Sequence, residues 1–169
     1  KAIARSHAFL IGQHRVLHKH MTFGPGDIDM PTLPVFLLHS LASGATCVLA
    51  DADLRAVGQV KADPVLNQIR GVGVTSISGS PAFFKQLANA LTSAGSTIET
   101  VRHIFTGGAR VPAELVDQLT HVFPNAAVDI VYGSTECEPI AVLDAIAHRE
   151  ALVSSTAQGA MASICIIFT

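Results

Sequence analysis

The 169-residue sequence is 49% hydrophobic and only 14% charged, with a mean hydropathy of +0.44 and a formal net charge of −2. It has no basic tract to neutralise a phosphate backbone and only 5% aromatic residues, which argues against nucleic-acid binding. The length predicts one domain, but an isolated domain usually carries about 25% charged residues. The composition therefore predicts a piece of a larger protein or a subunit of an oligomer.

No uninterrupted apolar run approaches the ~20 residues of a membrane span, so no transmembrane segment is expected. The N-terminus lacks the charged-then-apolar order of a signal peptide. Cys47, Cys137 and Cys165 are odd in number and show no C-x-x-C spacing, which favours a reducing compartment. These features predict a cytoplasmic protein.

Hydrophobic periodicity and turn residues divide the N-terminal part of the chain into short elements. Spacings of three and four indicate one helical face, whereas β-branched apolar runs indicate buried strands. In chain order, the patterns predict a helix over residues 1–21, an irregular proline-rich approach over 29–34, a helix over 35–44, a buried strand over 45–50 and a short helix over 64–69.

The remainder alternates strands and helices with short connections. Pro81 and Pro112 stand where two helices are expected to begin. Gly71 and Gly73 resemble the start of a dinucleotide-binding fingerprint, but they precede a strand, whereas the fingerprint follows one. The predicted elements are strands over 74–77, 101–105 and 127–131, and helices over 81–91 and 113–122. Strands that alternate with helices predict an α/β fold with a parallel sheet.

Three successive predicted strands end in glycine and hydroxyl residues, at 79–80, 106–108 and 132–136. The carboxyl ends of parallel strands lie along one edge of a sheet, where open α/β sheets bind ligands. Glycines without Cβ atoms let a flat ligand approach the backbone. The three ends together therefore predict a ligand groove.

The segment Tyr132-Gly133-Ser134-Thr135-Glu136 offers the chemistry that a nucleotide with its metal requires. An aromatic ring can stack on a base, hydroxyls can hydrogen-bond phosphate oxygens, and a glutamate can hold Mg²⁺. The alternative is an ordinary strand and turn, followed by a helix that Ser134 or Thr135 caps. For these residues taken alone, both interpretations stay open.

Two other groups could hold a metal. His14 and His18 are four residues apart, with His20 nearby, but no carboxylate or cysteine accompanies them, and a packed or solvated helix is favoured. Asp51 and Asp53 follow a predicted strand, where a solvated turn is the ordinary interpretation.

Candidate nucleophiles are weaker. Ser78 and Ser134 lack the G-x-S-x-G pattern of a hydrolase elbow. Cys137 lies beside Glu136, but a buried structural cysteine is favoured over a reactive thiol. Glu138 is expected on the surface of a helix or loop.

Four motifs in a fixed order resemble the adenylate-forming, or AMP-binding, superfamily of acyl-CoA synthetases, luciferases and peptide-synthetase adenylation domains. They are Thr106–Pro112 and Tyr132–Glu136, preceded by Pro31–Phe36 and Gly79–Pro81. The segment 29–53 is most similar to fatty-acyl ligases and to the β-lactone synthetases of olefin pathways.

This resemblance implies that residues 1–145 form the central part of the large N-terminal, AMP-binding domain, and that residues 146–169 are an atypical or truncated tail. It also implies a two-step reaction. A fatty or other apolar carboxylic acid attacks ATP to give an acyl-adenylate, and coenzyme A or another acceptor then takes the acyl group.

The resemblance also implies roles for individual residues. Thr135 would hydrogen-bond the α-phosphate, and Glu136 would hold Mg²⁺; these two are the implied catalytic residues. Tyr132 would stack on adenine. The residues implied to bind the nucleotide are Gly107, Gly108, Ala109, Tyr132, Gly133, Ser134 and Thr135.

The chain also departs from the family pattern. It lacks the glycine-rich phosphate loop, the ribose-binding aspartate and the C-terminal domain with its catalytic lysine. Leu37, and not histidine, follows Phe36, and residues 160–169 lack the expected glycine-rich strand. The isolated chain is therefore expected to be inactive without the missing parts of its parent. The alternative function is a non-catalytic nucleotide-binding or scaffold relic of the fold.

Overall fold

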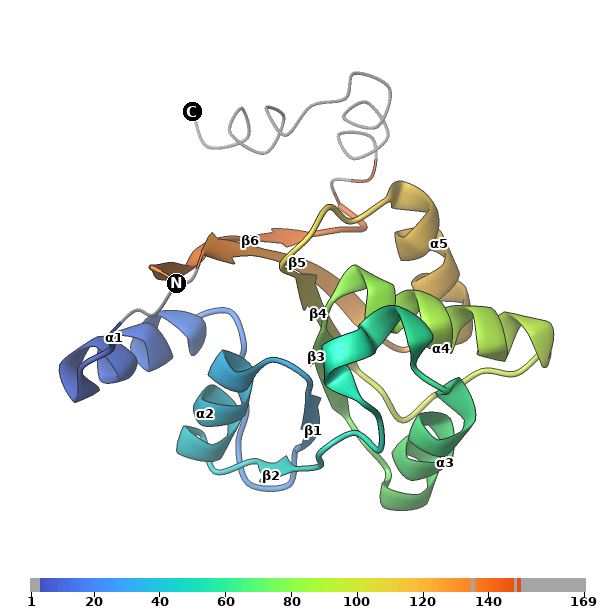
Figure 1. The fold of residues 1–169 in the computed structure, drawn as a ribbon, viewed down its shortest axis with the longest axis horizontal. Coiled ribbons are helices and arrows are strands. Elements are labelled where there is room, and N and C mark those ends of the chain that lie inside the picture. Colours follow the sequence, from blue (N-terminus) through green and yellow to red (C-terminus); the bar gives the residue numbers. More distant parts are fainter. Residues whose placement is uncertain (1–3, 135, 148, 150–169) are drawn as a thin grey trace.

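One mixed sheet organises the structure. The computed structural model describes residues 4–134, 136–147 and 149. The six strands lie in the order β2-β1-β3-β4-β5-β6 (Figure 1). Neighbours among the first five are parallel, and β6 is antiparallel to β5. The strands are β1 (Ile28–Pro31), β2 (Thr46–Cys47), β3 (Ser76–Gly79), β4 (His103–Gly107), β5 (Ala127–Ser134) and β6 (Cys137–Asp144). The predicted α/β class with a parallel sheet is confirmed.

Helices cover both faces of this sheet (Figure 1). They are α1 (His7–Leu17), α2 (Pro34–Ala42), α3 (Ala62–Val72), α4 (Pro81–Ser93) and α5 (Ala113–Val122), with a 3₁₀ helix, η1 (Leu54–Gln59). One face carries α3, α4 and α5, and the other carries α1 and α2. The helix predicted over 113–122 has the bounds of α5. The helix predicted over 1–21 is shorter, because Ser6 caps its start and accepts a hydrogen bond from the Phe9 amide.

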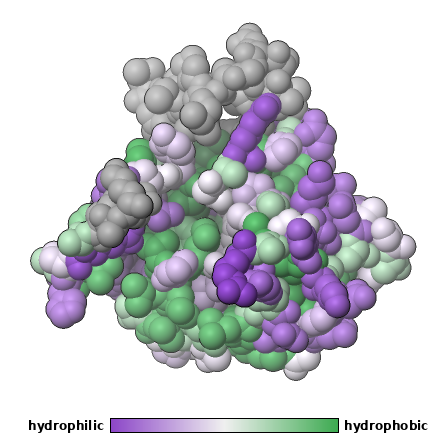
Figure 2. Space-filling view, viewed as in Figure 1, coloured by the Kyte–Doolittle hydropathy of each residue, from purple (hydrophilic) through white to green (hydrophobic). Residues whose placement is uncertain are grey.

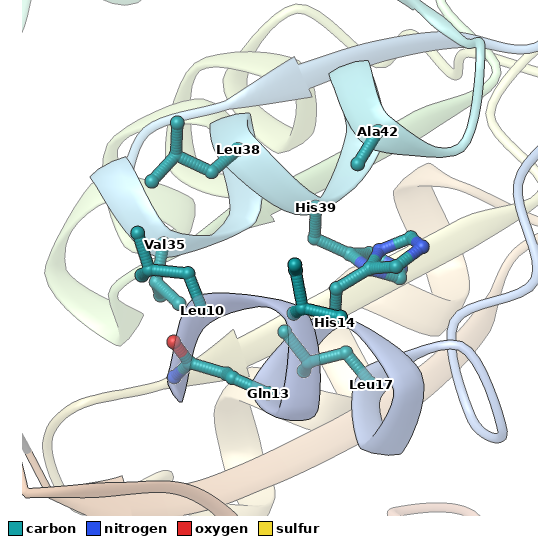
Figure 3. Close-up of a pocket in the computed structure, with 9 residues that line it drawn as sticks. Leu10, Gln13, His14, Leu17, Val35, Leu38, His39 and Ala42 are labelled. Carbon is teal, nitrogen blue, oxygen red and sulfur yellow. The ribbon is translucent and has the colours of Figure 1, made fainter. Parts of the chain in front are cut away.

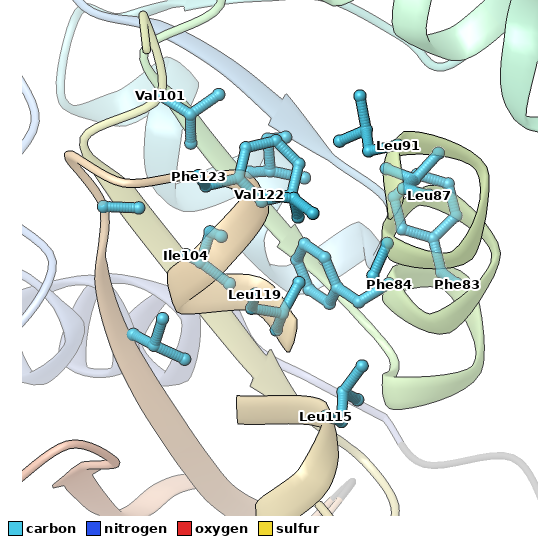
Figure 4. Packing of buried hydrophobic residues seen from close by; sticks show 14 of the residues in the cluster. Phe83, Phe84, Leu87, Leu91, Val101, Ile104, Leu115, Leu119, Val122 and Phe123 are labelled. Carbon is cyan, nitrogen blue, oxygen red and sulfur yellow. The ribbon is translucent and has the colours of Figure 1, made fainter. Parts of the chain in front are cut away.

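Alternating side chains of the strands supply two separate cores. On β4, Ile104 faces the large cluster under α3, α4 and α5, whereas Phe105 faces the small cluster under α1 and α2. Phe83 and Phe84 of α4 are fully buried in the large cluster (Figure 4). The small cluster consists of Leu17, Met21, Phe23, Phe36, Ala45, Phe105 and Val131.

Three elements differ from the sequence-based expectations. The segment predicted to be irregular contains β1, because a four-residue strand ending in Pro31 is too short to show a period of two. The strand predicted over 45–50 is only a two-residue edge strand, Thr46–Cys47, and it is not buried. The alternative interpretation of a helix capped by Ser134 or Thr135 is wrong, because β6 turns back and pairs with β5.

Several large apolar side chains lie on the surface of the α1–α2 side. Ile11, Leu38, Leu41 and Leu49 are each at least half exposed. Figure 2 shows apolar side chains gathered over this part of the molecule. Among the described residues, no helix combines the length and apolar character that crossing a bilayer requires. Most of the predicted atypical tail, 146–169, lies outside the described residues.

Candidate nucleotide site at the ends of β4 and β5

The three glycine-containing strand ends lie along one edge of the sheet, as predicted. Strands β3, β4 and β5 are neighbours and run parallel. Gly79 pairs with Thr106, and Gly107 pairs with Val131. The last residues of β5 therefore extend beyond the end of β4, with the glycines of β4 directly beside them.

Gly107 is required by a close approach of two backbones. A Cβ atom at this position would clash with the carbonyl oxygen of Val131 on the neighbouring strand. Gly108 follows with a φ of +78°, in the left-handed region that favours glycine. Gly108 and Ala109 are exposed, so the backbone at the end of β4 is open to a ligand.

We expect Gly107→Ala to destabilise the protein by about 1–3 kcal/mol, because either β4 or β5 must shift to relieve the clash. Gly71→Ala is the matched control. Gly71 lies in α3 with nothing within 4 Å of an added Cβ, and alanine there should stabilise the helix by about 0.5–1 kcal/mol. Urea unfolding of both variants measures whether their changes in the free energy of unfolding have opposite signs. Equal free energies of unfolding would contradict the close approach.

The aromatic and hydroxyl residues of the motif lie at the end of β5. Tyr132 pairs with Ala141 and is 43% exposed, and Ser134 pairs with Cys137 and is also exposed. Between Tyr132 and Ser134 the register with β6 shifts. Glu136 is exposed in the turn between the two strands, whereas Thr135 lies outside the described residues. The structure thus brings the described motif residues to one hairpin, which we call the β5–β6 hairpin (residues 132–138).

Glu138 differs from the expectation of a helix or loop surface residue. It lies on β6, half-buried, and its Cγ would be 2.8 Å from a Cβ at Gly133. The missing side chain of Gly133 therefore makes room for the Glu138 stem. Burial raises the pKa of Glu138, and the positive charge of Arg5 partly opposes this. Cys137 was expected to be buried but is exposed, because it is the first residue of β6 at the turn.

The predicted histidine pair belongs to a different part of the fold. His14 and His18 on α1 lie beside His39 of α2, with ring centroids 4.9 to 6.2 Å apart. The Nε2 of buried His39 lies 2.8 Å from the Met21 carbonyl oxygen, which can only accept. A neutral His39 therefore accepts at Nδ1, 2.9 Å from the Nδ1 of His14. Burial lowers the pKa of His39, which favours this neutral form.

The rings of His14 and His39 border an apolar groove of about 230 Å³ between α1 and α2 (Figure 3). No group of three or more His, Cys, Asp or Glu side chains within the described part of the chain is placed to hold a metal ion. Asp53 instead binds its neighbour Arg55, whose guanidinium lowers the pKa of the Asp53 carboxyl. The arrangement corresponds to the packed helix and the solvated turn that the sequence favoured.

One buried carboxylate was not singled out by the sequence. Asp29 on β1 is fully buried beneath α2, where its Oδ2 lies 2.6 Å from the Ser40 hydroxyl oxygen. The only sequence signal was a lone acidic residue between apolar neighbours, which a surface turn near Pro31 would also explain.

Comparison with known proteins identifies the family of this chain. The sequence model of the AMP-binding enzyme family matches residues 1–165, and the chain belongs to this family. The olefin β-lactone synthetase of Stenotrophomonas maltophilia is 34% identical over 98% of this chain and 29% of its own length. The long-chain-fatty-acid–CoA ligase of Thermus thermophilus is 30% identical over 75% of this chain and 23% of its own length. The chain thus spans less than a third of these curated relatives.

Solved structures agree on the fold. O-succinylbenzoate coenzyme A synthetase from Bacillus subtilis, in complex with AMP, superposes with a TM-score of 0.70 at 22% identity. The match covers 89% of this chain and 30% of that one. The luciferase-like enzyme of Zophobas morio gives a TM-score of 0.67 at 20% identity, over 91% of this chain and 36% of that one.

Proposed function

We propose that this chain supplies the central, nucleotide-contacting part of an ATP-dependent ligase. The enzyme activates a fatty or other apolar carboxylic acid as an acyl-adenylate and then passes the acyl group to coenzyme A or another acceptor. The observation that carries the proposal is the side-by-side placement of the end of β4, with the exposed Gly108 and Ala109, and the β5–β6 hairpin. The family membership and the named activities of the relatives support it.

Each residue of the site has a proposed role that follows from its chemistry. Tyr132 presents an exposed ring on which adenine can stack. Gly108 and Ala109 leave the backbone accessible beside it, and Gly107 is proposed to keep β4 close to β5 at the same edge. Ser134, with Gly133 before it, offers a hydroxyl to the phosphates, and Thr135 is proposed to donate to the α-phosphate.

The donor set fits a hard divalent cation. Glu136 is an exposed carboxylate at the turn, with the Ser134 hydroxyl close in sequence, and Mg²⁺ prefers oxygen ligands of this kind. When bound, Mg²⁺ neutralises charge on phosphate oxygens. We propose that Glu136 holds it there, while Tyr132 and Thr135 orient the nucleotide for attack by the carboxylate of the acid.

The test is ATP–pyrophosphate exchange by the full-length protein that carries this segment, across acids from acetate to long-chain fatty and β-hydroxy acids. Exchange that depends on one class of acid would establish adenylation and identify the substrate class together. Folded protein that binds AMP but shows no exchange with any acid would favour the non-catalytic nucleotide-binding relic instead.

A further inference from the structure

The strand pairing of the β5–β6 hairpin is irregular within the motif. The register shifts between Tyr132 and Ser134, so the regular antiparallel ladder is interrupted within the motif. Beyond the interruption, the strands are joined again at the pair of Ser134 and Cys137. Residues that must present a ring and a carboxylate to a ligand therefore need support from elsewhere in the fold.

That support comes from α1, at the other end of the sequence. The side chain of Gln13 is buried, with 7% of the residue exposed, and its Nε2 donates to the Glu138 carbonyl oxygen at 2.8 Å. The two residues are 125 positions apart. A buried amide that donates to a strand carbonyl fixes the position of that strand, because leaving either group unpaired costs free energy.

The side chain of Glu138 connects this fixed part of β6 to the motif by packing against Gly133. Its stem packs where a side chain on Gly133 would otherwise lie, 2.8 to 3.1 Å from the position of an added Cβ. Leu17, one turn further along α1, packs in the same small core as Val131 of β5. Helix α1 thus shares a small core with β5, and Gln13 connects the helix directly to β6.

We propose that Gln13 is a positioning residue for the nucleotide-contacting hairpin, which it holds through the backbone of Glu138. This inference rests on the proposed function for its effect on ATP. The Gln13 amide donates to the backbone of Glu138, so the residue acts through β6 and not on the nucleotide. Gln13 contributes to nucleotide binding by fixing the positions of the Tyr132 ring and the Glu136 carboxylate.

The test compares two variants that lose the donor with one matched control. Gln13→Met keeps the length of the side chain without its amide, and Gln13→Glu keeps the size but replaces the donor by an acceptor. Gln68→Met is the control, because Gln68 also donates to a backbone carbonyl, that of Leu49 at 2.8 Å, but at the β2 edge of the sheet.

Two readouts are measured on the full-length protein. Hydrogen exchange reports the amides of residues 132–140, and ATP–pyrophosphate exchange reports KM for ATP separately from kcat. We expect both Gln13 variants to speed amide exchange in the hairpin and to raise KM for ATP about three- to tenfold, since a lost hydrogen bond has an effect of this size. Gln68→Met should change neither.

The inference is overturned if both Gln13 variants match Gln68→Met in hairpin exchange and in KM. A loss of thermal stability without these two changes would also overturn it, since it would show an ordinary packing role. If the wild-type protein shows no ATP–pyrophosphate exchange, the proposed function fails, and amide exchange alone then decides whether Gln13 holds the hairpin.

Discussion

Glu136→Gln is expected to lower Mg²⁺-dependent ATP–pyrophosphate exchange by at least about 100-fold, the size of effect seen when a group that stabilises developing charge is removed. Glutamine has the same shape as glutamate but carries no negative charge, and Mg²⁺ is held chiefly by carboxylates and substrate phosphates. Glu136 is exposed at the turn of the hairpin, so we expect the substitution to leave the fold intact.

The control for this prediction is Glu99→Gln. Glu99 is also exposed, but it lies in the connection between α4 and β4, away from the β5–β6 hairpin. The control should retain wild-type exchange, and a higher Mg²⁺ concentration should partly restore the Glu136 variant. Full activity of Glu136→Gln at low Mg²⁺ would show that this carboxylate does not hold the ion.

The second large effect is a fall in stability between about pH 4 and pH 7 that depends on Asp29. Ser40 lies 2.6 Å from Oδ2 of Asp29 and 2.9 Å from the Phe36 carbonyl oxygen, but its hydroxyl has only one proton. A protonated Asp29 accounts for both short distances. Its carboxyl group donates to the Ser40 oxygen, and the Ser40 hydroxyl then donates to the Phe36 carbonyl oxygen. The other oxygen of Asp29, Oδ1, has no hydrogen-bond partner among the described residues.

The pKa of Asp29 agrees with this arrangement. Burial raises it to about 6, and hydrogen bonding of Ser40 to the ionised carboxylate opposes the shift only in part. In the unfolded chain the pKa is about 3.9, so between these values the folded state binds the proton that the unfolded state has released. Stability is therefore greatest at the acidic end of this window and falls by about 2–3 kcal/mol as the pH rises through 6.

Asp129 also lowers the stability of the protein as the pH rises. Burial, followed by the negative charge of Asp144 across the β5–β6 pair, raises the pKa of Asp129 to about 6. Its side chain is only partly buried, so its contribution to the fall in stability should be the smaller of the two.

Urea unfolding at pH values from 4.5 to 7.5 checks the prediction. Asp29→Asn should flatten most of the pH dependence and should be at least as stable as the wild type at pH 7.5, because an amide can donate to Ser40 as the neutral acid does. Asp51→Asn, at an exposed position, is the control and should leave the slope unchanged. A wild-type stability that rises over this range would show that Asp29 is ionised in the folded protein.

Local patterns in the sequence were sufficient for most of the framework. Proline at the first position of α4 and at the N-cap of α5, with apolar spacing, placed these two helices. The glycine-rich ends placed the edge where β3, β4 and β5 finish. The family resemblance rested on the same strand-end motifs and was confirmed by the match over residues 1–165. The individual roles of the site residues remain predictions.

Other features of the structure could not be predicted from local sequence patterns. Strand β6 follows a motif that a capped helix would explain equally well, and only its pairing with β5 decides between them. The partner of His14 is His39 on another helix, a contact that the i,i+4 spacing with His18 does not reveal.

The sequence by itself determined the alternation of strands and helices from β3 to β5 and the chemistry collected at their ends, because both depend on neighbouring residues. Only the tertiary structure decided that Asp29 is buried beneath Ser40 and that Gln13 holds the hairpin 125 residues away. Such contacts depend on how distant elements pack, and burial in that packing, not the residue type, determines whether a polar side chain is charged, paired or exposed.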